Sequence, residues 1–159
     1  MGTSILIKVG DFSLKEETKK KKIYLKRYRN YLIRIKRLEE KLFQIDNQLI
    51  GLKITQITDM PKGGIAVTKD DLLIKKEETE HRIQNLVDIS RNVRMEIFDC
   101  LETIDDYRFS EVLESYFIDG YTLEAIAENK NYSIQHVGYL YGKGLEMVQI
   151  VQNDKKNVR

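Results

Sequence analysis

A row of apolar side chains runs through the first third of the chain, at intervals of alternately four and three residues. Its members are Tyr24, Tyr28, Tyr31, Ile35, Leu38, Leu42, Ile45, Leu49 and Leu52. This a/d pattern of a coiled coil predicts a long helix whose narrow apolar stripe must be covered by a partner helix. Ser13 and Glu16 match a capping box, so we predict that the helix begins near Leu14 and runs to about Leu52.

A second helix is predicted after residues 53–68, where Pro61, Gly63 and Gly64 break the pattern with a turn. Thr68 and Asp71 then repeat the capping box. The apolar positions that follow at heptad-compatible spacing are Leu72, Ile83, Leu86, Val93, Ile97, Cys100 and Ile104. We therefore predict an all-α protein with a long antiparallel coiled-coil hairpin over residues 14–104. In the alternative, either stripe pairs with a second chain, and heptad spacing does not separate the two arrangements.

The composition excludes several classes of protein. One cysteine rules out an internal disulfide framework, and two histidines with that cysteine cannot form a standard zinc cluster. No apolar run approaches the ~20 residues that span a membrane, and the first residues lack the features of a secretory signal. No nucleophile–base pair, phosphate-binding loop or metal-ligand spacing is visible. We therefore expect a cytoplasmic protein that is not an enzyme and has no metal or cofactor, with His81 on the surface and Cys100 in the core.

The net charge of +2 conceals a strong asymmetry along the chain. Residues 15–41 contain twelve Lys or Arg and four Asp or Glu, a net charge of +8. Residues 95–128 contain ten Asp or Glu and one Arg, a net charge of −9. Two interpretations are open: the segments face each other, within one chain or between two copies, or the basic segment contacts nucleic acid.

The last third of the chain changes to short helices, which we predict to form a domain over residues 107–150, with flexible ends at 1–13 and 151–159. One helix follows Asp105-Asp106 and ends at Asp119-Gly120. Thr122 is a suitable N-cap for the next helix, Asn131 can take a positive φ in the turn after it, and Ser133 caps the last helix. Together with the small Ala127, this spacing predicts a helix-turn-helix.

The last helix has a predicted buried side and three glycines. The buried side consists of Ile134, Val137, Leu140 and Leu145. Gly138, Gly142 and Gly144 each cost roughly 1 kcal/mol relative to alanine inside a helix. Either these glycines allow another backbone to approach closely, or the helix ends near Tyr141.

The predicted DNA-contacting residues lie on and around this last helix, whose first half would lead into the major groove. Its outward residues are Gln135, His136, Tyr139 and Lys143. A glutamine can pair bidentately with adenine. Ser133 and the first backbone N–H groups of the helix suit a phosphate. Thr122 and Lys130 are candidates for contacts with the DNA backbone.

Residues 109–145 resemble sigma-70 region 4, in the order Val112-Leu113, Tyr116, the Gly120 turn, Thr122 to Ala127, then Ser133 and Val137. Over residues 20–150 the chain is similar to small regulators from phages and prophages of Gram-positive bacteria, of the ArpU/RinA type and a related family of unassigned function. The matching features are the charged Leu38-Glu39-Glu40-Lys41-Leu42 segment and the Asp59-to-Gly64 loop. The resemblance implies transcription control or DNA binding near phage genes, in the cytoplasm of a bacterial host.

The sequence departs from the family pattern along the recognition helix, where region 4 usually has basic residues and this chain has Ile134, His136 and Gly138. Phosphate neutralisation supplies much of the affinity for a duplex, so we expect this module alone to bind double-stranded DNA weakly. A homodimer would raise the affinity by placing two modules on two half-sites.

Two functions are compatible with these patterns. In the first, the chain is a DNA-binding transcriptional regulator whose hairpin serves for dimerisation or for contact with RNA polymerase. In the second, it is a protein-interaction adaptor with a degenerate helix-turn-helix, which binds RNA polymerase or another host protein through the acidic 95–128 surface without reading DNA.

Overall fold

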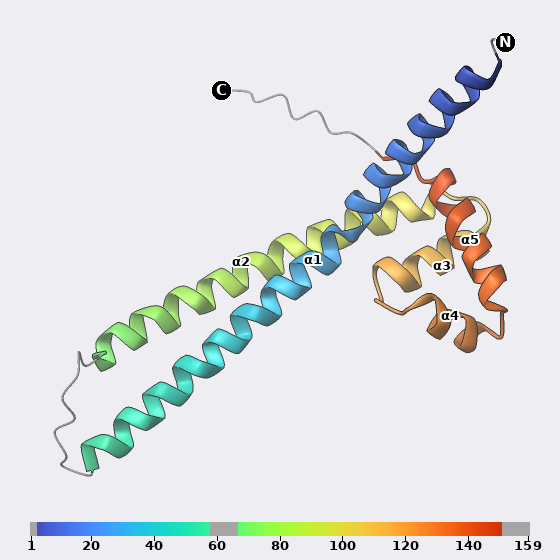
Figure 1. The fold of residues 1–159 in the computed structure, drawn as a ribbon. Coiled ribbons are helices and arrows are strands. Elements are labelled where there is room, and N and C mark those ends of the chain that lie inside the picture. The colour runs from blue at the N-terminus through green and yellow to red at the C-terminus, as the bar shows by residue number, and fades with distance from the viewer. Residues whose placement is uncertain (1–2, 58–66, 151–159) are drawn as a thin grey trace. The chain divides into compact units, whose positions relative to one another are not determined.

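The computed structural model describes residues 3–57 and 67–150, and within them the side chains of residues 13–54 and 67–150. Five helices make up nearly all of these two ranges (Figure 1): α1 (Thr3–Ile57), α2 (Lys69–Glu102), α3 (Tyr107–Phe117), α4 (Leu123–Lys130) and α5 (Ile134–Met147). Neither range contains a strand, so the predicted all-α class is confirmed.

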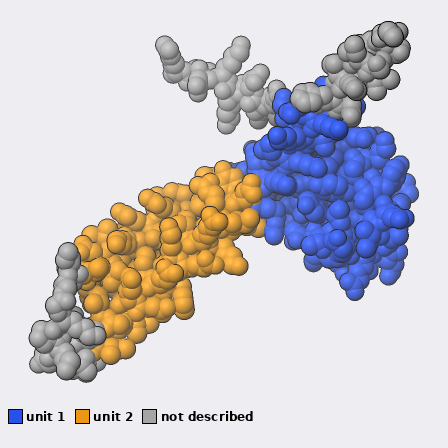
Figure 2. All heavy atoms as spheres, viewed as in Figure 1, with its two compact units in different colours: residues 1–29, 92–159 blue, residues 30–91 orange. Residues whose placement is uncertain are grey.

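The chain divides into two compact units (Figure 2). Unit 1 comprises residues 1–29 and 92–159, and unit 2 comprises residues 30–91. Both long helices therefore contribute to both units. The boundary predicted between residues 104 and 107 falls inside unit 1, because α3, α4 and α5 pack with the neighbouring parts of α1 and α2.

The first helix begins earlier than predicted, at Thr3 instead of near Leu14. Ser13 and Glu16 lie inside the helix, so the capping box proposed there is wrong. A serine caps a helix only where the chain enters it from non-helical backbone, and no proline or turn cluster separates residues 3–13 from the heptad region. The predicted Pro/Gly turn at Pro61, Gly63 and Gly64 lies outside the described residues, as does the end at 151–159.

In unit 2, residues 30–57 of α1 and 69–91 of α2 run side by side in opposite directions (Figure 1). Burial follows the predicted stripes: Ile35 and Leu72 are buried, and the other stripe leucines of this unit are half-buried. An ion pair between Lys76 and Asp46, with a Nζ–Oδ1 distance of 2.7 Å, joins the two helices. At the start of α2, the Asp71 N–H donates to Thr68 Oγ1 at 3.2 Å, which confirms the predicted cap.

Unit 1 has a core to which all five helices contribute. Its most buried side chains include Leu25 of α1 and Ile97 of α2, both 0% exposed. The short helices and the residue that follows α5 add Val112, Leu113, Phe117, Ile126, Val137, Leu140, Leu145 and Val148. Phe117 contacts the rings of Tyr116 and Tyr141, with centroid distances of 4.9 Å and 5.9 Å. Phe117 thus joins α3 to α5 inside this core.

The C-terminal end of α5 is attached to both long helices. The buried Lys21 of α1 donates from Nζ to the Glu146 carbonyl at 3.0 Å, where a helix carries partial negative charge. The Cys100 thiol of α2 donates to the Gln149 carbonyl at 3.2 Å. Burial raises the pKa of this thiol, which keeps it protonated and agrees with the predicted core role of Cys100.

Tyr141 makes the stability of unit 1 depend on pH in the alkaline range. Burial, the neighbouring Tyr116 phenol and a hydrogen bond to it raise the pKa of Tyr141 to about 12. In the unfolded chain a tyrosine ionises near pH ~10. Between about pH 10 and 12 the unfolded state therefore binds fewer protons than the folded state. The contribution of Tyr141 to stability is fully present below this window and is lost as pH rises through it.

We expect the Tyr141→Phe variant to lose less stability than the parent between about pH 9 and 11. Between about pH 9 and 11 about half of the rise in the Tyr141 pKa is realised, or about 1.4 kcal/mol, which we reduce to about 1 kcal/mol because Tyr141 is only half-buried. Urea unfolding at both pH values measures the difference. Tyr107→Phe is the matched control, because Tyr107 is 70% exposed. An equal loss in both variants and the parent would contradict this assignment.

Candidate nucleic-acid interface

The turn between α4 and α5 is fixed by the residues that the sequence indicated. Thr122 Oγ1 accepts from the Ala125 N–H at 3.2 Å and caps α4. Asn131 takes the left-handed conformation, with φ 54° and ψ 38°, and the Tyr132 N–H donates to the Ala127 carbonyl at 2.9 Å. These local contacts set where α4 ends and where the chain turns into α5.

The beginning of α5 is capped as predicted, since Ser133 Oγ accepts from the His136 N–H at 3.1 Å. Ala127 of α4 is buried, as expected for the small residue of a close helix pair. On α5, Val137, Leu140 and Leu145 are buried, in agreement with the predicted apolar side. The start of α5 is therefore fixed by the Ser133 cap and by the buried Val137 that follows it.

Most of the seven predicted contact residues are open to solvent. Those classed as exposed are Thr122, Ser133, Gln135, Tyr139 and Lys143, whereas Lys130 and His136 are half-buried. Tyr139 is 54% exposed although its ring also contacts Phe109, with centroids 6.3 Å apart. Contact with a base requires an exposed side chain, and Gln135 and Tyr139 both meet this requirement.

His136 lies in a short row of rings on this surface. Tyr132 meets it edge-on with a centroid distance of 4.9 Å, and Tyr139 stacks on it at 6.4 Å. The imidazole therefore has an aromatic ring as a neighbour on each of two sides. The three rings span the turn and the first half of α5, so they connect the α4–α5 turn to the exposed residues of the helix.

Both cationic members of the predicted site are already paired with carboxylates. Lys130 at the end of α4 forms an ion pair with Glu111 of α3. Lys143 Nζ lies 3.2 Å from Glu146 Oε2, one turn further along α5. A phosphate contact by either lysine would therefore have to replace a carboxylate partner, which agrees with the expected weak binding of this module by itself.

Ile134 was predicted to be buried, and the structure contradicts this, because its side chain is 60% exposed. It has the correct spacing from Val137 but occupies the first turn of α5, before the row of buried positions begins. Periodicity identifies the face of a helix but not how far the neighbouring helices extend along it. Ile134 is thus an apolar residue beside Gln135 that the sequence did not assign to the site.

The glycines of α5 do not end the helix near Tyr141, since it continues to Met147. Gly144 is buried, and a Cβ at this position would lie 3.0 Å from Leu113 Cδ1. Gly138 and Gly142 have open space where a Cβ would be. Neither predicted explanation holds as stated, because the atoms that approach Gly144 belong to the side chains of Leu113 and Phe109 and not to another backbone.

In the ranges that the structure covers, no helix combines the length and apolar character required to span a membrane. The same residues contain no cluster of three or more histidine, cysteine, aspartate or glutamate side chains suited to a metal ion. Comparisons with protein-family models, with curated proteins and with solved structures found no match.

Proposed function

We propose that this chain is a DNA-binding transcriptional regulator of phage type, in which α4 and α5 act as a helix-turn-helix. The observation that carries the proposal is the left-handed Asn131 turn between two side-chain-capped helices, which leaves Gln135 and Tyr139 exposed on the second of them. In this motif the first half of the second helix enters the major groove. The α1–α2 coiled-coil hairpin would serve for homodimerisation or for contact with RNA polymerase.

The exposed residues at the start of α5 offer different kinds of contact to a base pair. Gln135 has the paired acceptor and donor that match adenine in the major groove. Ile134, which is exposed beside it, suits the methyl group of thymine. The Ser133 hydroxyl and the N-terminal N–H groups of α5 favour a phosphate oxygen. Thr122 and Lys130 are then the contacts to the adjoining backbone.

Sequence preference is expected to depend on Gln135 and Tyr139 together. In the variant Gln135→Ala/Tyr139→Ala, selection from a random duplex library at low salt should show at least about a tenfold loss of preference between the best site and random DNA, because each good base contact contributes about 1–3 kcal/mol. Affinity for random DNA should change little, since neither side chain is charged.

The matched control is Gln84→Ala/Tyr107→Ala, which removes the same residue types from exposed positions on α2 and α3. It should leave the sequence preference intact. If the α5 variant and the control retain the same preference, α5 does not read bases and the proposed helix-turn-helix function is wrong.

The adaptor function has one observation in its favour. Lys130 and Lys143 are both engaged by glutamates, so the α4–α5 surface has little free positive charge, whereas residues 95–128 are strongly acidic. An adaptor would bind no duplex at any salt concentration. It would capture RNA polymerase or another host protein in a manner sensitive to charge reversal at Glu111 and Glu114.

A further inference from the structure

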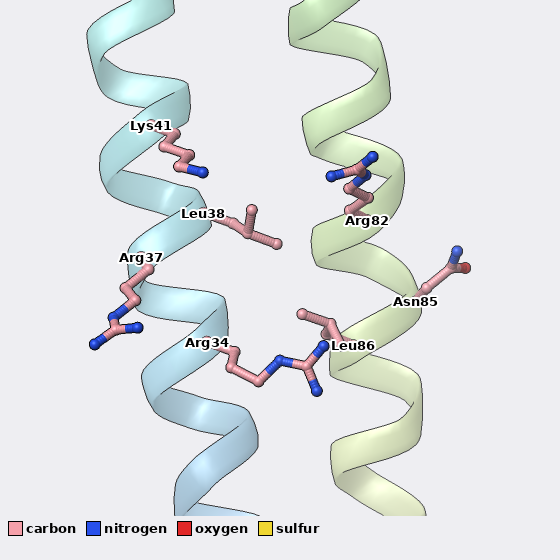
Figure 3. Close-up of a pocket in the computed structure, with 7 residues that line it drawn as sticks. All are labelled: Arg34, Arg37, Leu38, Lys41, Arg82, Asn85 and Leu86. Atoms are coloured by element: carbon pink, nitrogen blue, oxygen red, sulfur yellow. The ribbon is translucent and has the colours of Figure 1, made fainter.

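A positively charged cleft lies between α1 and α2 within unit 2 (Figure 3). Its volume is about 450 Å³, and it is lined by Arg34, Arg37, Leu38, Lys41, Arg82, Asn85 and Leu86. In Figure 3 the side chains of Arg34 and Lys41 extend from α1 towards α2, Arg82 lies over its own helix, and Arg37 and Asn85 point away from the space between the helices. Leu38 and Leu86, both half-buried, lie between the charged groups.

Within the part of the chain that the structure describes, these cations form no ion pair with a carboxylate. None of the lining residues is acidic, and no ion pair shown among the described residues involves Arg34, Arg37, Lys41 or Arg82. Arg34 instead lies over the Tyr31 ring, 5.5 Å from its centroid. A cluster of like charges opposes folding by its own repulsion, and a bound anion would relieve that repulsion.

The positive lining continues along the helix pair. Lys41 and Arg82 also line an adjoining cleft, to which Lys75 contributes and in which Glu78 is the one carboxylate among the lining residues. Arg34 and Lys41 are separated by two helical turns, or ~10.5 Å along α1 at ~1.5 Å per residue. An extended ligand with regularly repeated negative charges fits this arrangement better than a compact anion does.

We infer that this cleft binds the phosphodiester backbone of double-stranded DNA. Duplex DNA carries one negative charge per ~1.7 Å of its axis, so several phosphates fall within the length of the cleft. Guanidinium groups such as those of Arg34 and Arg82 match phosphate oxygens with paired N–H donors. An acidic protein segment fits less well, because the two half-buried leucines offer it little apolar surface.

This inference deepens the proposed function, on which its choice of DNA as the ligand rests. It assigns a second contact that supplies the positive charge that the α4–α5 surface lacks. The two contacts make separate contributions: α5 would determine which sequence is preferred, and the cleft would determine how strongly any duplex is held. Salt dependence and sequence preference therefore test them separately.

The test removes three of the four cations that line the cleft, in the variant Arg34→Gln/Lys41→Gln/Arg82→Gln of the full chain. Binding of a fluorescent random-sequence duplex is measured by anisotropy between about 50 and 200 mM salt. The slope of log affinity against log salt should decrease in magnitude by about 2.7, or ~0.9 for each lost phosphate contact, and affinity near the middle of this range should fall at least tenfold.

The matched control is Lys36→Gln/Lys53→Gln/Lys69→Gln, which removes the same formal charge from exposed positions of unit 2 outside the cleft. Its slope should change by less than about 1. Circular dichroism checks folding, and the cleft variant should melt at a higher temperature than the parent because repulsion has been removed. Equal effects of the two variants on the slope, or no effect of either, would overturn the inference.

Two further measurements separate the possible failures. If inorganic tripolyphosphate displaces the duplex as effectively as an equal charge of unlabelled duplex, the ligand is a free polyphosphate and the inference is wrong. It is also wrong if the parent protein binds no duplex at the lowest salt. If the cleft variant behaves as expected but Gln135→Ala/Tyr139→Ala keeps its sequence preference, the cleft binds DNA and only the base-reading function fails.

Discussion

Replacing Phe117 by alanine should lower the free energy of unfolding of unit 1 by about 3–5 kcal/mol, the range for removing a buried aromatic side chain. Phe117 is 1% exposed, and it is the largest fully buried side chain of the described residues. Its ring meets Tyr116 edge-on and stacks on Tyr141 of α5. The substitution therefore leaves a cavity and removes two aromatic contacts, one of which connects α3 to the proposed recognition helix.

Urea unfolding followed by tyrosine fluorescence measures this effect. The chain has no tryptophan, and Tyr31 is the one tyrosine of nine that lies in residues 30–91, so the signal reports mainly on unit 1. The midpoint should fall by roughly 2 M if the m-value is about 2 kcal/mol per molar urea. Phe43→Ala is the control, because Phe43 is 67% exposed in unit 2 and should have an effect within about 0.5 kcal/mol. Comparable effects of the two variants would mean that α3 does not pack as described.

The sequence predicted which faces of α1 and α2 are buried because a heptad spacing records the side on which a helix meets a neighbour. From Tyr31 to Leu52 every predicted position is buried or half-buried. It did not predict where α1 begins, because a serine followed three residues later by a glutamate, as in Ser13 and Glu16, can occur inside a helix as well as at its start. Only the backbone preceding the pair distinguishes the two cases.

The ends of the short helices could be predicted because they depend on local chemistry. Asp106, Thr122 and Ser133 each accept a hydrogen bond from a backbone N–H at the start of a helix, and Asn131 takes the left-handed turn. The exposure of Ile134 could not be predicted in the same way, because it depends on how far the core extends along α5.

Features that join residues distant in sequence were also missed. The ion pair between Lys130 and Glu111 connects α4 with α3, and Lys21 is buried against the C-terminal end of α5. In the sequence, Arg34, Lys41 and Arg82 contribute only to the overall charge, although in the structure they line one cleft. Charge totals along the chain do not show which cations of two different helices gather in one place, as those of this cleft do.

A second large loss of stability is expected at Gly144, where α3 packs closely on α5. The variant Gly144→Val should lose about 3 kcal/mol of stability, at the upper end of the usual range for overpacking a core. A Cβ there would lie 3.0 Å from Leu113 Cδ1 and 3.4 Å from Phe109 Cβ, so the two additional methyl groups of valine have no space without moving α5 away from α3. The small gain in helix propensity over glycine, a few tenths of a kcal/mol, does not offset this.

Gly142→Val is the matched control, because it makes the same substitution two positions earlier in α5, where a Cβ meets nothing within 4 Å. It should change stability by no more than about 0.5 kcal/mol, since the helix gains a Cβ and no contact is broken. Urea unfolding compares both variants with the parent. If α5 ended near Tyr141, both positions would lie beyond the helix and the two variants would have similar stability. A difference of several kcal/mol between them therefore supports both the continuous helix and its close contact with Leu113.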